Sequence, residues 1–144
     1  PALKASRVRR LFASMIDSLL MSVIVLPVMY LGGLFELAST APMSWGYSLK
    51  TGALAAIVFL LLNGLLLIQR GQTLGKMMLS IKIIKEDCTP ADASTLLIRY
   101  AVYFMGNLIP VIGTLFGLVN VLFIFGDRKQ CLHDRIANTI VVNV

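Results

Sequence analysis

A single acidic residue inside a long apolar stretch places the strongest constraint on this chain. From Leu11 to Phe35 the sequence runs for 25 residues with one charged side chain, Asp17. A helix of that length crosses the hydrocarbon core of a bilayer, since each residue adds about 1.5 Å. An ionised carboxylate inside such a helix costs roughly 3 kcal/mol on insertion scales, so it normally faces a partner or a water-filled cavity. We therefore expect a transmembrane helix whose acidic residue has a structural or functional use.

Other polar side chains share the face of Asp17 on this first helix. Arg10 precedes it by seven residues, which is close to two full helical turns. Three serines follow one another at spacings of four: Ser14, Ser18 and Ser22. The pattern predicts one polar stripe on an otherwise apolar helix.

The composition is that of an integral membrane protein. Of the 144 residues 58% are hydrophobic and 14% are charged, whereas a soluble domain has about 25% charged residues. The 13 lysines and arginines outnumber the 7 acidic residues, but they gather at the ends of apolar segments. That placement indicates anionic lipid head groups as partners and argues against nucleic acid. The length allows one small domain over residues 1–144, and the first apolar segment is too long for a signal peptide.

The apolar segments predict a helical bundle that crosses the membrane four times. The second span is expected at Thr51–Gln69, after a loop at 36–50. The stretch 92–126 is about 35 residues, long for one span and short for two. A break at 107–110 would divide it into two short helices of about 16 residues each. The alternative is a single crossing there, and hence three crossings in all.

The positive-inside rule decides between these topologies. Residues 1–10 carry four basic side chains, and further bases follow the second span and the stretch 92–126. Four crossings place all these clusters on the cytoplasmic side, where such residues accumulate. We therefore expect an all-α membrane fold with two short final helices and both termini in the cytoplasm.

Two segments outside the spans have the character of β-strands. After a short helical turn to about Met78, residues 79–85 alternate as a strand does, although they also fit an interfacial helix. Residues 139–144 are rich in β-branched side chains. We predict that the two segments pair beneath the bundle as a small two-stranded element. The faces expected to turn toward the helix ends carry these residues: Leu79, Ile81 and Ile83 on one strand, and Ile140, Val142 and Val144 on the other.

Four polar residues of the spans are predicted to lie at one depth. Each is seven residues from a charged flank, which corresponds to about 10 Å into the cytoplasmic leaflet. They are Asp17, Asn63, Arg99 and Asn120. As an ion or proton site, Asp17 would be the exchanging group, stabilised in its charged form by Arg10 and Arg99, and the asparagines would supply neutral oxygen ligands. As a structural layer, the same residues would only fix helix packing.

The basic turn after the second span offers candidates for lipid contact. Residues 71–76, GQTLGK, resemble a phosphate-binding loop but lack its spacing and the Ser or Thr after the lysine. A structural turn at the level of the head groups is the simpler interpretation. Arg70, Lys76 and Lys82 are our candidates for contact with lipid phosphate.

The sequence offers no convincing metal or catalytic site. Cys131, His133 and Asp134 could suggest metal ligands, but no second cluster completes the set. There is no nucleophile with a base and an orienting group either. We therefore expect no metal, no cofactor and no enzymatic activity.

Three stretches resemble the RDD family of small bacterial membrane proteins. These are Arg10 with Asp17 at the opening of the first span, GQTLGKMMLSIKII after the second, and RKQCLHDRIANTIVV near the C-terminus. The family takes its name from one arginine and two aspartates, which match Arg10 (or Arg9), Asp17 and Asp134. One departure is Asn138, where a glycine is common. The resemblance implies a bacterial inner membrane and no settled biochemical activity, although cation/proton antiport has been suggested for members.

Together these observations predict a homo-oligomeric, transporter-like or channel-like module. Its site candidates are Arg10, Asp17, Asn63, Arg99, Asn120 and Asp134. The alternative is a scaffold or lipid-binding protein in which the polar layer only locks the helices together. A wetted path that reaches Asp17 distinguishes the two, because exchange requires access.

Overall fold

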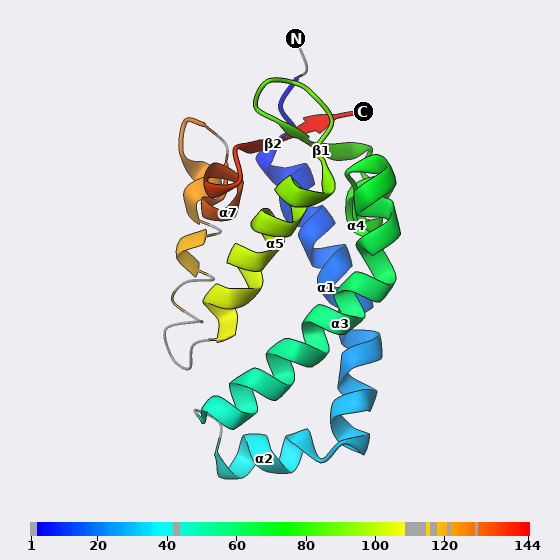
Figure 1. The fold of residues 1–144 in the computed structure, drawn as a ribbon, viewed down its shortest axis with the longest axis vertical. Helices are drawn as coiled ribbons and strands as arrows, with labels where there is room; N and C mark the ends of the chain where they lie inside the picture. Colours follow the sequence, from blue (N-terminus) through cyan, green and yellow to red (C-terminus); the bar gives the residue numbers. More distant parts are fainter. Residues whose placement is uncertain (1–2, 42–43, 109–114, 116–117, 121, 129) are drawn as a thin grey trace.

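Two long helices and a small sheet at one end organise the molecule (Figure 1). The structure is a computed structural model that describes residues 3–41, 44–108, 115, 118–120, 122–128 and 130–144. Helices α1 (Arg7–Leu31) and α3 (Trp45–Arg70) have 25 and 26 residues and are long and apolar enough to cross a membrane.

The region expected as a loop after the first span is largely helical. Gly33 adopts a left-handed φ of 69° and separates α1 from α2 (Leu34–Thr40), which lies at the end of the molecule opposite the sheet (Figure 1). The side chain of Ser44 then accepts a hydrogen bond from the backbone N–H of Tyr47 at 3.1 Å. This cap starts α3 six residues before the expected span. The prediction of a loop over 36–50 was wrong, because polar residues interrupt the apolar sequence there but remain compatible with a helix.

After α3 the chain folds back as predicted, through a helical turn into a strand. Gly71 adopts a φ of 66°, and a Cβ there would lie 2.6 Å from the carbonyl oxygen of Ile83. Helix α4 (Leu74–Met78) and strand β1 (Ile81–Lys85) follow. The close approach explains why a glycine ends α3.

The predicted pairing of the two strand segments is confirmed. Strand β1 runs antiparallel to β2 (Thr139–Asn143), with Ile83 opposite Val141. The other edge of β2 receives the start of the chain, which the sequence analysis did not anticipate. The N–H of Ala5 donates to the Val141 carbonyl at 2.9 Å, and the N–H of Asn143 donates to the Leu3 carbonyl at 3.0 Å. Both terminal segments are therefore tied to one sheet.

The face expected for the second strand was wrong. Ile81, Ile83 and Val141 share a core with Ala13 and Leu67 of the long helices. Another cluster, on the other face of the sheet, contains these three residues: Ile84, Ile140 and Val142. The register explains the difference, because neighbours along a strand point to opposite faces. Val144 is exposed.

Helix α5 (Ala93–Leu108) has the 16 residues expected of a short third helix and packs against α3. The rings of Phe59 and Tyr100 meet there with centroids 4.8 Å apart. A 3₁₀ turn η1 (Phe123–Phe125) and helix α7 (Leu132–Ile136) lead into β2. Residues 109–114, 116–117 and 121, which belong to the expected break and fourth crossing, lie outside the described residues. The number of crossings therefore stays a prediction.

Candidate functional site

Asp134 lies at the centre of a buried ion cluster. Its carboxylate pairs with Arg10 through one oxygen and with Arg99 through the other. Asp134 is fully buried, and both arginines are buried with it. Arg99 also donates to the Thr139 hydroxyl at 2.8 Å. The cluster therefore joins α1, α5, α7 and β2, and it includes both arginines that were expected to pair with Asp17.

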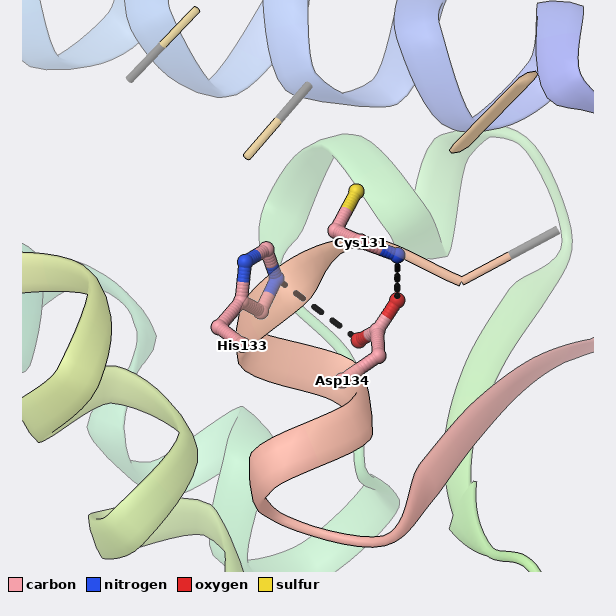
Figure 2. Close-up of side chains that lie close together, drawn as sticks. All are labelled: Cys131, His133 and Asp134. Carbon is pink, nitrogen blue, oxygen red and sulfur yellow. Dashed lines mark hydrogen bonds and ion pairs between the residues drawn. The ribbon is translucent and has the colours of Figure 1, made fainter. Parts of the chain in front are cut away.

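The same carboxylate caps its own helix. The backbone N–H of Cys131 donates to Asp134 at 3.0 Å (Figure 2). Figure 2 also shows His133 beside this carboxylate, with its Nε2 3.6 Å from Asp134. Ligand atoms of Cys131, His133 and Asp134 lie within 4.8 Å of one another, which is the spacing of a metal site.

The charges around this trio do not favour a metal ion. Arg10 and Arg99 occupy both oxygens of Asp134, so a divalent cation would meet two guanidinium groups. Burial, and then the nearby charges of Arg99, Lys76 and Arg10, lower the pKa of His133 well below its usual value. The residues fit a polar network with a neutral histidine better than a metal centre.

Asp17 holds the start of α4 against α1. Its two carboxylate oxygens accept hydrogen bonds from the N–H of Gly75 at 2.8 Å and from the Thr73 hydroxyl at 2.5 Å. The expected neighbours Arg10 and Arg99 have their described ion pairs with Asp134 instead. Asp17 therefore binds the N-terminus of α4, where the backbone N–H groups make a negative charge favourable.

The two asparagines of the predicted layer also accept hydrogen bonds from backbone N–H groups at the starts of short helices. Asn63 accepts from the N–H of Leu74 at 2.9 Å, at the start of α4. Asn120 accepts from the N–H of His133 at 3.1 Å, at the start of α7. Both side chains are 2% exposed. The oxygens expected as ion ligands thus satisfy backbone donors that would otherwise be left unpaired.

A polar cavity adjoins these contacts. It has a volume of about 470 Å³ and lies between α1, α3, α4, α5 and α7. Its wall includes Asp17, Ser14, Ser18, Thr73 and Arg99. Of the predicted stripe, Ser14, Asp17 and Ser18 line this cavity. Arg10 lines a smaller neighbouring cavity, and Ser22 is exposed.

The lipid-phosphate candidates fall into two places. Lys76 lies on the wall of the polar cavity. Arg70 and Lys82 line a separate surface groove of about 660 Å³ beside the sheet. Lys76 thus faces an internal cavity, whereas Arg70 and Lys82 lie at the surface.

Sequence reasoning missed several members of the network. Thr73 is 1% exposed and caps α4 as well as contacting Asp17; a threonine just before a helical turn was its available signal. Gln130 is 2% exposed, and its amide donates to the Thr139 carbonyl at 2.9 Å and to Glu86 at 2.8 Å. No local sequence pattern predicts such a contact, because it forms only when distant segments of the chain come together in the fold.

The fold and site define a membrane protein with a polar network at one end of its long helices. The most apolar windows of α1 and α3 are only 6% and 22% buried, unlike the core helices of soluble proteins. The chain belongs to the RDD family, whose model matches residues 4–138. Comparison with curated proteins and with solved structures gives no significant match.

Proposed function

We propose that the protein is transporter-like and exchanges a proton or small cation at Asp17. The observation that carries this proposal is the position of Asp17 on the wall of the 470 Å³ polar cavity, beside Ser14 and Ser18. A carboxylate that only fixed packing would need no hollow next to it. Exchange at Asp17 requires access for water, and the hydroxyl groups of Ser14, Ser18 and Thr73 on the same wall are compatible with water there.

Within this proposal, the proton is favoured over a metal cation. Asn63 and Asn120, which could have completed a coordination shell, accept hydrogen bonds from backbone amides. Lys76 and Arg99 line the same cavity, and their positive charges would repel a metal cation there. A proton needs no coordination shell. Its arrival at Asp17 would also weaken the hold of that carboxylate on Thr73 and Gly75.

Substitution Asp17→Asn tests the proposal. We expect the variant to fold, because an amide oxygen can still accept the hydrogen bond of Gly75. We expect its proton flux to fall to the level of protein-free vesicles, because an amide does not titrate. The measurement is the decay of a pH gradient across reconstituted vesicles containing a pH-sensitive dye, with Na⁺ or K⁺ gradients as separate arms. The matched control is Asp87→Asn, which removes an exposed carboxylate outside the cavity.

The second candidate is a scaffold whose polar layer only locks the elements together. The contacts of Asp134 with Arg10 and Arg99 favour it, because they join distant parts of the chain without using a ligand. The same experiment separates the two functions. Full flux in a folded Asp17→Asn protein would refute exchange at Asp17. Loss of folding would support the scaffold.

A further inference from the structure

A smaller cavity next to the polar one carries an excess of positive charge. It has a volume of about 140 Å³, and its wall includes four basic side chains: Arg7, Arg10, Lys76 and Arg99. Among the described residues, none of those lining it is acidic. Asp134, behind Arg10 and Arg99, offsets one positive charge. We call this space the basic cavity.

Two donors of this cavity lack acceptors in the part of the chain that the structure describes. The Nε–H groups of Arg7 and Arg99 are both buried without a hydrogen-bond partner there. Arg99 is 2% exposed, so bulk water does not compensate for the missing acceptor. Leaving a buried charged donor unpaired is costly. An oxyanion in the basic cavity would supply both acceptors and charge.

The size and surroundings of the basic cavity fit a phosphate group. A volume near 150 Å³ accommodates a guest as large as benzene, so a tetrahedral oxyanion fits. Apolar side chains of Val8, Leu11 and Phe125 complete the wall, and such surroundings strengthen charge-assisted hydrogen bonds. Guanidinium groups match phosphate oxygens through paired, parallel N–H bonds.

The polar cavity continues the basic one toward the middle of the long helices. The two share Ser14, Lys76, Arg99 and His133. Farther along, the larger space is walled by Met21, Phe59 and Phe104. A ligand anchored at the arginines would thus place an apolar tail against these residues. A membrane protein meets such molecules at high concentration, because phospholipids surround it.

We propose that the basic cavity binds the phosphate group of an anionic membrane lipid, with Arg7, Lys76 and Arg99 as donors. The lipid tail extends along the apolar part of the polar cavity. This binding does not depend on proton exchange at Asp17. Equilibrium binding without a gradient tests it separately.

The test uses the whole protein in bilayer discs of phosphatidylcholine, titrated with phosphatidic acid. Native mass spectrometry counts bound lipid and gives its apparent affinity. We expect the wild-type protein to retain phosphatidic acid selectively, and Arg7→Gln and Lys76→Gln each to weaken retention about tenfold. Both residues are partly exposed, so we expect the variants to fold, and thermal unfolding checks this. The matched control is Lys85→Gln, which removes a base outside the cavity and should change affinity less than about twofold.

Two results would overturn the proposal. One is equal retention by the wild type, Arg7→Gln and Lys76→Gln, or an equal loss in Lys85→Gln, since binding would then reflect surface charge. The other appears in a separate arm with inorganic phosphate. If free phosphate binds with the same dependence on Arg7 and Lys76 while phosphatidic acid does not compete, the ligand is not a lipid.

Discussion

The backbone at Asn138 adopts a φ of 52°, a left-handed conformation that residues with a Cβ rarely adopt. Asn138 follows the C-terminus of α7 and leads into β2. A glycine is the usual residue at such a helix end. This geometry gives a physical reason why a glycine would be favoured at this position. Asparagine is tolerated because its short polar side chain reaches the left-handed region more easily than others do.

We predict that Asn138→Gly leaves stability within about 0.5 kcal/mol of the wild type, because relief of backbone strain offsets the greater entropy of unfolded glycine. Asn138→Ala and Asn138→Val should each destabilise the protein by about 1–2 kcal/mol. Thermal unfolding in detergent micelles, followed by the fluorescence of Trp45, measures both effects. A loss in the glycine variant as large as in the alanine variant would show that the asparagine side chain, not the backbone, is what matters.

At the residue scale, the sequence anticipated some partners and missed others. The predicted strand pairing brings the C-terminal segment with Asp134 back to the start of the first span, where Arg10 lies. The pairing of Arg99 with Asp134 did not follow. Depth along a helix is set by residue count, but the direction of a side chain around it depends on how the helices pack.

At the scale of elements, two short helices are held by side chains from elsewhere in the chain. Asn63 and Asp17 bind the first N–H groups of α4, while Asn120 binds one at the start of α7. Helices of five residues are far too short to be stable alone. Polar residues of the predicted spans therefore fix small helices against the rest of the fold. The sequence predicted the helical turn near Met78 but gave no sign of these caps, because they come from distant segments.

Close packing of α4 on α1 requires Gly75. A Cβ at this position would collide with the carbonyl oxygen of Ala13 and lie 3.0 Å from the carboxyl carbon of Asp17. We predict that Gly75→Ala destabilises the protein by about 1–3 kcal/mol, because a backbone atom cannot move aside as a side chain can. Thermal unfolding of purified protein measures the effect.

The matched control for this prediction is Gly64→Ala within α3. No atom lies within 4 Å of a Cβ built there, so the added methyl group should be neutral or stabilising by up to about 1 kcal/mol. Equal effects of the two substitutions would mean that the approach of α4 to α1 is not the cause.

At the scale of the whole molecule, the sheet constrains the topology. Strand β1 precedes α5, strand β2 ends the described chain, and the two are paired. A sheet of this kind cannot have its strands on opposite sides of a bilayer. The chain between them must therefore leave and return to the same side. This reasoning favours an even number of crossings, which charge counting had also favoured, and the pairing of residues 3–5 with β2 extends it to the start of the chain.

We accordingly predict that both ends of the chain and the turn after β1 share one side of the membrane, the cytoplasmic side by the distribution of basic residues. Cys88 in that turn is exposed and Cys131 is buried, so Cys88 reports accessibility without mutation. In inverted vesicles a membrane-impermeant maleimide should label Cys88. In a background lacking native cysteines, Leu3→Cys and Val144→Cys should label from the same face, because both positions are exposed. Lys50→Cys, near the start of α3, should label only from the opposite face. If Leu3→Cys and Val144→Cys were labelled from different faces, the strands would not pair as described. If Lys50→Cys were labelled from the same face as Leu3→Cys, helix α1 would not cross the membrane.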